Sequence, residues 1–210
     1  MKSFIQKLGL VVFISALNFI SVAQTKPNPF AADVPLVYLG VDFTQVRVIN
    51  DASAIPSDIK NRHFEGINLL IMTESKKYDW QKALEKTTIS NDLSLVKARN
   101  EKVDETKIMS TSTADETRLK QEDIEKMVKQ YDFSGKKGVG LIVFMESLSK
   151  TSKNGSMWVT FVDMDTKKLI LTERMVGSAM GFGFRNYYAY TVYKVIQDIK
   201  KNKLSAWRNK

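Results

Sequence analysis

The sequence of 210 residues contains no cysteine and only one histidine, His63. Without cysteine the chain can form neither a disulfide nor a cysteine-based metal site, so its stability must come from the burial of apolar surface. Any histidine-based triad would depend on His63, and a site built from several histidines is excluded. The G-x-S-x-G and H-E-x-x-H motifs of hydrolases are also missing. We therefore expect no metal and no cofactor, and we assign no catalytic residue.

Long apolar runs are rare, and the clearest one lies near the amino terminus. The basic residues Lys2 and Lys7 precede the stretch LGLVVFISALNFI, and the small residues Ser21 and Ala23 follow it. This is the layout of a cleaved secretory signal over residues 1–23, and the run is shorter than the roughly 20 apolar residues of a membrane span. No cysteine stands at the expected cleavage point. The sequence therefore predicts export to the periplasm or the periplasmic face of the outer membrane without a lipid anchor, with a retained signal anchor as the alternative.

Acidic residues are fewer than basic ones. After residue 23 the chain has 30 Lys and Arg and 23 Asp and Glu, which gives a net charge of +7. Such a surplus favours anionic partners, and export disfavours nucleic acid among them. The remaining candidate partners are anionic lipid, an anionic envelope polymer and an envelope protein. The surplus of charge can also serve solubility alone. A flexible leader is expected at 24–34, because it holds two prolines without periodicity, and a single domain at 35–210.

The first half of that domain reads as strand, helix and a less regular middle. In residues 35–50 apolar side chains recur with the two-residue period of a strand, and Val37, Leu39, Val41 and Phe43 are expected on one of its faces. Helical spacing predicts an amphipathic helix over 58–74, with Ser57 as its cap. The remaining predictions are short helices at 78–86 and 90–103, a short strand at 87–89, a loop at 105–117 and a helix containing Ile124, Met127, Val128 and Tyr131.

The last third predicts an antiparallel meander and a closing helix. Residues 138–149 are apolar on both faces at their start, which is typical of a central strand. Two further strands follow at 157–165 and 168–177, and the pair Asn154-Gly155 is expected to form the first hairpin turn. Tyr188, Val192, Val195, Ile196 and Ile199 mark the helix. The predicted fold class is α/β (α+β): a mixed sheet with a carboxy-terminal three-stranded meander, covered by helices.

A family resemblance is carried by this last third. The segment GLIVFMESLSK, followed by WVTFVDMDTKKLILTERMVG and a helix, resembles the envelope domain found in the amino-terminal part of the Tol translocation protein and in curli-secretion-type lipoproteins. The early strand YLGVDF is similar to the first strand of that domain, and the whole chain resembles small exported proteins of Bacteroidetes-type bacteria. The resemblance implies a fold and an envelope location, and no functional residues. Those secretion lipoproteins are anchored at a cysteine that this chain lacks, so a secretion role is not carried over.

The stretch GSAMGFGFRN at 177–186 is the most distinctive candidate contact site. Its G-x-G before a helix partly matches a phosphate loop, but the third glycine is missing and phenylalanines stand where small residues are preferred. One interpretation is a turn whose phenylalanines enter the core. The other is an exposed contact loop formed by Met180, Phe182, Phe184 and Arg185.

A second candidate contact site is the basic carboxy-terminal tail, residues 200–210. Its members are Lys200, Lys201, Lys203, Trp207 and Arg208. Cations beside a tryptophan are typical of a segment at a membrane interface, and a solvated helix end is the alternative.

Carboxylates in the predicted strands offer an alternative of another class. Asp42, Glu146 and Glu173 could perform acid–base chemistry if two of them faced each other. This alternative is a periplasmic hydrolase using Asp42 and Glu146. His63 lies on the inward stripe of its helix, which favours a packed imidazole over a catalyst.

Asp163 and Asp165 could be taken for a cation site, but Lys167 and Lys168 follow them, and hairpin turns favour aspartate for local hydrogen bonds. We therefore interpret them as turn residues. The function that the sequence favours is a non-catalytic binding or assembly module of the cell envelope, with apolar contact from residues 180–184 and a basic surface. A small-molecule binder, with its ligand between the sheet and the first helix, is a further alternative.

Overall fold

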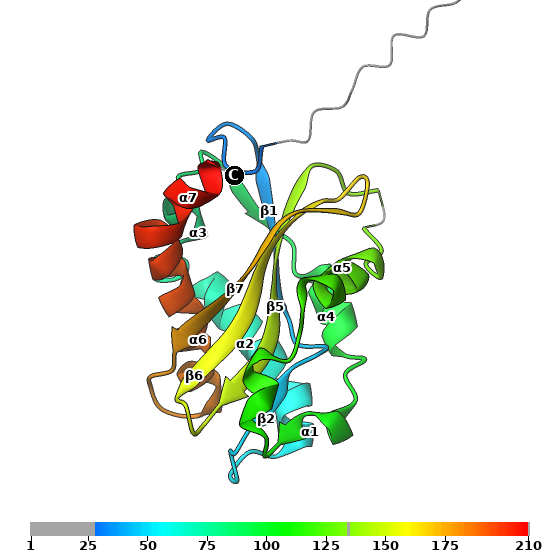
Figure 1. The fold of residues 1–210 in the computed structure, drawn as a ribbon, viewed down its shortest axis with the longest axis vertical. Coiled ribbons are helices and arrows are strands. Elements are labelled where there is room, and N and C mark those ends of the chain that lie inside the picture. Colours follow the sequence, from blue (N-terminus) through cyan, green and yellow to red (C-terminus); the bar gives the residue numbers. More distant parts are fainter. Residues whose placement is uncertain (1–27, 134, 210) are drawn as a thin grey trace, which may run out of the picture.

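The computed structural model describes residues 28–133 and 135–209, so the expected signal at 1–23 lies outside the described residues. Seven strands form one mixed sheet, and helices cover both of its faces (Figure 1). This confirms the mixed α/β class. No helix in these two ranges has the length and apolarity needed to cross a membrane.

The strands are β1 (Leu36–Asp42), β2 (Arg47–Ile49), β3 (Ile89–Asn91), β4 (Met109–Ser110), β5 (Val139–Ser149), β6 (Asn154–Asp163) and β7 (Lys168–Ser178). The α-helices are α1 (Pro56–Asp58), α2 (Phe64–Thr73), α3 (Trp80–Ala83), α4 (Ser94–Asn100), α5 (Gln121–Lys129), α6 (Phe184–Asp198) and α7 (Leu204–Arg208). π-helical turns at Ile59–His63 and Ile199–Lys203 join α1 to α2 and α6 to α7, and 3-10 turns lie at Glu105–Lys107 and Thr113–Thr117.

The long strand β5 is the centre of the sheet. Along one edge it pairs in parallel with β1 and then with β2, and β3 and β4 extend these two strands outward, also in parallel. Along its other edge β5 pairs antiparallel with β6, which pairs antiparallel with β7. All 11 residues of β5 are buried, as expected for an apolar strand covered on both faces. The predicted meander is confirmed.

Two apolar cores lie on opposite faces of the sheet. The larger core holds side chains of α2, α6 and α7, and the smaller one those of α4 and α5. The apolar stripes predicted for the helices near residues 124 and 188 are buried: Ile124, Met127, Val128, Tyr188, Val192, Val195, Ile196 and Ile199. Tyr131 is buried too, but it lies beyond the end of α5 and not in the helix that was expected to contain it.

A bulge in β1 changes which core its residues enter. The pairing with β5 skips one residue between Tyr38 and Gly40, and Gly40 has φ +105°, which glycine adopts without strain. As a result Leu39 packs in the smaller core, whereas Val41 and Phe43 pack in the larger one. The prediction of a single face through β1 was wrong, because regular alternation does not anticipate a bulge. The predicted single strand is also interrupted between β1 and β2.

The pair Asn154-Gly155 does not form the first hairpin turn. The turn occupies residues 150–153, with Lys153 at φ +51°, and Asn154 already pairs with Ser149. Gly155 instead lies where α6 crosses the sheet, since a Cβ atom there would stand 2.8 Å from the Oγ1 atom of Thr191. This glycine marks the close approach of a helix, which the turn prediction missed.

Three smaller predictions were also wrong. The leader is not free from residue 28 onward, because Phe30 is buried and packs its ring edge-on against Phe161, with 5.0 Å between the ring centroids. Ser57 is not a cap, since Ile55 precedes the helix and Pro56 begins it. The expected loop at 105–117 contains β4 and both 3-10 turns.

Candidate functional site

The segment between β7 and α6 forms an exposed loop at the end of the molecule opposite to α7 and the carboxy terminus (Figure 1). At its tip Phe182 is 95% exposed, and Met180 is 58% exposed. Gly181 has φ +120° and Gly183 has φ +73°, so both glycines are required by the backbone. The interpretation in which both phenylalanines enter the core was therefore wrong for Phe182.

The base of the loop is fixed by aromatic packing. Phe184 is half-buried, and its ring stacks on His63 with 4.7 Å between centroids and meets Tyr188 edge-on at the same 4.7 Å. Partial burial, and then the neighbouring Arg62, lower the pKa of His63, which favours the neutral imidazole. His63 is thus a packed residue that supports Phe184, and the predicted loop divides into a fixed base and a protruding tip.

A hollow of about 360 Å³ lies beside the tip. Phe182 and the 58% exposed Ile55 border it, and Lys150 places its Nζ atom 4.6 Å from the centroid of the Tyr187 ring. At its buried side Asp51 accepts a hydrogen bond from the hydroxyl of Tyr188 at 3.3 Å. The hollow also brings Asp58 to the side of His63, but Asp58 forms an ion pair with Arg62 at 3.5 Å.

We call Ile55, Met180 and Phe182 the contact tip. They are three of the five large apolar side chains that are exposed in the described part of the chain. Three exposed cations lie on the adjoining segments. Lys150 lines the same hollow, Arg185 follows Phe184 in α6, and the carbonyl of Lys153 accepts a hydrogen bond from the amide of Ala179 at 2.8 Å. The contact tip is therefore an apolar point with a basic rim.

The predicted basic tail is not a free segment. Trp207 is 2% exposed, and its Nε1 atom donates to Oε2 of Glu173 at 2.6 Å. Lys203 pairs with the same carboxylate at 2.7 Å, and Arg208 pairs with Glu85 at 2.7 Å. The expectation of an interfacial tryptophan was wrong. Residue composition alone does not distinguish a chain end that lies at a membrane interface from one that packs on the protein core.

Lys200 and Lys201 remain exposed in the π-helical turn that follows the carboxyl end of α6. The 15 residues of that helix correspond to about 22 Å at 1.5 Å per residue. These two lysines and the contact tip therefore do not form one continuous surface.

The carboxylates considered for catalysis are engaged elsewhere. Asp42 is fully buried; its Oδ2 atom accepts hydrogen bonds from Nε of Arg99 at 2.8 Å and from the hydroxyl of Tyr131 at 2.6 Å. Its Oδ1 atom accepts from the amide of Thr44 at 2.8 Å. Both oxygens therefore have donors already, and the site offers no free base.

Glu146 is held in the same way. It is fully buried and accepts hydrogen bonds from Nε of Arg174 at 2.9 Å, Nε1 of Trp158 at 3.2 Å, the hydroxyl of Ser156 at 3.1 Å and the amide of Leu119. This pattern is that of a structural ion pair. It gives no support to a hydrolase that uses Asp42 and Glu146.

Asp163 and Asp165 are turn residues, as predicted. One oxygen of Asp163 accepts from the amides of Asp165 at 3.0 Å and Thr166 at 3.1 Å. Asp165 in turn accepts from the amide of Gly138 at 2.9 Å. Across the described ranges no group of three or more His, Cys, Asp or Glu residues is placed to hold a metal ion.

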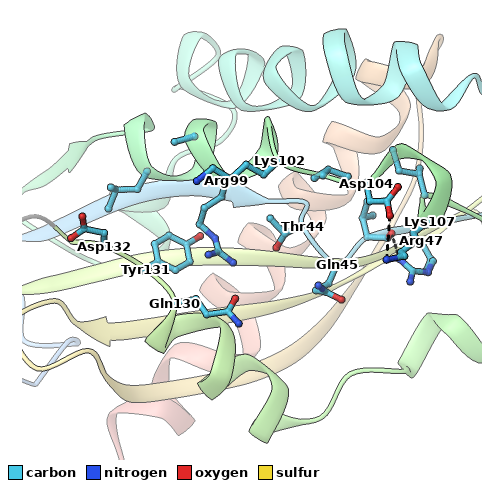
Figure 2. Close-up of a pocket in the computed structure, with 15 residues that line it drawn as sticks. Thr44, Gln45, Arg47, Arg99, Lys102, Asp104, Lys107, Gln130, Tyr131 and Asp132 are labelled. Atoms are coloured by element: carbon cyan, nitrogen blue, oxygen red, sulfur yellow. Dashed lines mark hydrogen bonds and ion pairs between the residues drawn. The ribbon is translucent and has the colours of Figure 1, made fainter.

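A second cavity, of about 440 Å³, lies where β1 ends (Figure 2). We call it the basic cavity because four cations line it: Arg47, Arg99, Lys102 and Lys107. The sequence analysis missed this site, whose walls come from residues 44–47, 95–108 and 130–132. One signal was present: Arg99 and Lys102 lie near the end of the helix predicted at 90–103, and Lys107 follows it at short spacing.

Comparisons with known proteins do not identify the chain. No protein-family model and no curated protein matches it. Among solved structures, a proposed neuraminyllactose-binding hemagglutinin homolog from Helicobacter pylori is similar, with 11% identity over 89% of this chain and 93% of that chain and a TM-score of 0.36. A likeness at this level carries no conclusion about function. The resemblance to Tol and curli-secretion domains stays a prediction.

Proposed function

We propose that this protein is an exported, non-catalytic module that binds the anionic lipid surface of the cell envelope through its contact tip. The observation that carries the proposal is the 95% exposure of Phe182 on a loop whose two flanking glycines hold it away from the core. In the free protein the apolar area of this ring faces water, and binding to an apolar surface buries it.

The energetics favour a weak and reversible attachment. Burying one large apolar side chain contributes about 1.5–3 kcal/mol, and each Lys or Arg near an anionic membrane surface contributes about 1 kcal/mol. The contact tip offers Phe182 with Ile55 and Met180, and its rim offers Lys150, Lys153 and Arg185. Apolar insertion and charge attraction therefore act at the same place.

Lipid fits this surface better than a rigid protein partner. A single protruding ring needs a matching pocket on a protein, whereas the boundary between headgroups and acyl chains accepts it without one. The basic rim and the net charge of +7 after residue 23 complement anionic headgroups.

Vesicle sedimentation tests the proposal. The folded chain without residues 1–23 should sediment with vesicles of phosphatidylethanolamine and phosphatidylglycerol, and much less with phosphatidylcholine. The substitution Phe182→Ser should weaken this binding roughly tenfold or more, because it removes the apolar insertion. Leu69→Ser is the matched control, since Leu69 is also 50% exposed but lies on α2. Equal binding by Phe182→Ser and the unaltered chain would refute the proposal.

A fluorescent reporter separates insertion from adsorption by charge. Trp80, Trp158 and Trp207 are all buried, so a Phe182→Trp variant adds one solvent-exposed tryptophan to three that emit from the core. Its red-shifted emission should move to the blue on anionic vesicles. Emission that stays red while the protein sediments would show adsorption without insertion and would contradict the proposed role of the ring.

A further inference from the structure

We infer that the basic cavity binds a small hydroxylated organic anion through a carboxylate or phosphate group of that molecule. This site is separate from the contact tip and does not depend on the function proposed above. It lies at the carboxyl end of β1, a strand paired in parallel with both of its neighbours. Ligands of open α/β sheets gather at such strand ends.

The central group of the cavity is Arg99, whose guanidinium is fixed before any ligand arrives. Its Nε atom donates to the buried Asp42 at 2.8 Å, and its Cζ atom lies 4.4 Å from the centroid of the Tyr131 ring. The Tyr131 hydroxyl donates to the same carboxylate at 2.6 Å, so ring and guanidinium share one anchor. Figure 2 shows the end of Arg99 directed toward the space between Thr44 and Gln130. A guanidinium held on one edge and one face can offer its other nitrogens to two oxygens of an anion.

Two carboxylates, Asp104 and Asp132, line the cavity beside the four cations. With Asp42, which holds Arg99, three negative charges stand against four positive ones, so a surplus of positive charge remains. Lys107 pairs with Asp104 at 3.2 Å, whereas Arg47 donates from its guanidinium to the carbonyl of Val46 at 3.0 Å. Partial burial, and then the neighbouring Arg118, lower the pKa of Arg47, and the nearby Asp115 opposes them only in part. An anion in the cavity would relieve this repulsion. Lys102, exposed at the rim, adds a further mobile cation.

The remaining walls indicate what else the ligand carries. The volume of about 440 Å³ lies within the range of small-molecule sites, roughly 300–1,000 Å³. Thr44, Gln45 and Gln130 supply hydroxyl and amide groups that hydrogen-bond to ligand hydroxyls, while Leu95 and Ile108 supply apolar contact. An anion with several hydroxyl groups and an apolar face fits this lining.

The test is a nuclear magnetic resonance titration of the ¹⁵N-labelled protein with three probes of similar size. Glucuronate carries a carboxylate, glucose 6-phosphate carries a phosphate, and glucose is neutral. We expect saturable shifts in residues 44–47, 98–108 and 130–132 with at least one of the two anions, and none with glucose. The anion that binds more tightly identifies the preferred group.

Charge-removing variants decide whether the cavity is responsible. Lys102→Gln and Arg47→Gln should each weaken anion binding about tenfold, as expected for the loss of a charge-assisted hydrogen bond. Lys200→Gln, an exposed lysine beyond α6, is the control and should bind unchanged. Lys102 is exposed, so its variant tests the inference even if Arg47→Gln fails to fold. Absence of saturable shifts into the millimolar range, shifts outside the cavity, equal shifts with glucose, or unchanged binding by Lys102→Gln would each overturn the inference.

Discussion

At the scale of single residues, the buried carboxylates show that a catalytic and a structural carboxylate in a strand look the same in the sequence. Asp42 and Glu146 were candidates because carboxylates in strands can meet across a sheet. Their actual partners, Arg99 and Arg174, lie 57 and 28 residues away in the chain. Such pairing depends on the tertiary fold, and no spacing rule in the sequence predicts it.

Glu146→Gln distinguishes the two roles. If Glu146 has a structural role, its replacement by glutamine leaves Arg174 without its charge partner. Breaking a buried ion pair costs about 3–5 kcal/mol of stability. Because Arg174 is 29% exposed, water compensates in part, and we expect the free energy of unfolding to fall by about 3 kcal/mol. Urea denaturation of this variant beside Glu122→Gln, an exposed residue of α5, measures the difference. Unchanged stability would argue against the structural role, since catalytic carboxylates are often replaced without loss of stability.

At the scale of elements, local patterns predicted the parts that depend on local physics. Apolar periodicity located β5, the meander, and the buried stripes of α5 and α6, since burial of one face or both leaves a periodic trace. The bulge at Gly40 and the helix crossing at Gly155 were missed, because each arises where two distant segments approach. For the same reason the loop containing Phe182 was recognised as a candidate site, because its residues are contiguous in the sequence. The basic cavity was missed, because its walls come from three separate segments.

The crossing of α6 over the meander yields a prediction about two glycines. A Cβ atom at Gly177 would stand 2.0 Å from the backbone oxygen of Thr191, and one at Gly155 would stand 2.8 Å from its side-chain Oγ1. We therefore expect Gly177→Ala to be the more damaging change, at about 3 kcal/mol or more, and Gly155→Ala to cost about 1–3 kcal/mol.

Thr191→Ala supplies the control for this pair. It removes the Oγ1 and Cγ2 atoms that face Gly155, keeps the Cβ atom, and leaves the backbone oxygen that faces Gly177. Thermal unfolding should show that Thr191→Ala recovers part of the stability lost in Gly155→Ala and none of that lost in Gly177→Ala. Equal recovery in both double variants would mean that α6 shifts as a body, and the prediction would fail.

At the scale of the whole molecule, no disulfide supports the fold, since the chain has no cysteine. Three tyrosines lie deep in its two cores. Burial raises the pKa values of Tyr38, Tyr131 and Tyr188 above the ordinary value of about 10, and the nearby Asp42 and Asp51 raise those of Tyr131 and Tyr188 further. The folded chain therefore holds these protons at a pH where the unfolded chain releases them. Their contribution to stability is complete below pH 10 and is lost as the pH rises toward the raised values.

Alkaline unfolding should follow from this linkage. The free energy of unfolding should stay level up to about pH 10 and then fall by roughly 1.4 kcal/mol per pH unit for each buried tyrosine. Absorbance at 295 nm, followed beside near-ultraviolet circular dichroism, should show that the phenolates of these three residues appear only as the tertiary signal is lost. Tyr131→Phe removes one of the three protons and should make the fall with pH shallower by about a third. Complete ionisation of all seven tyrosines while the tertiary signal persists would contradict the burial of these side chains, because a phenolate cannot be accommodated in an apolar core without unfolding it.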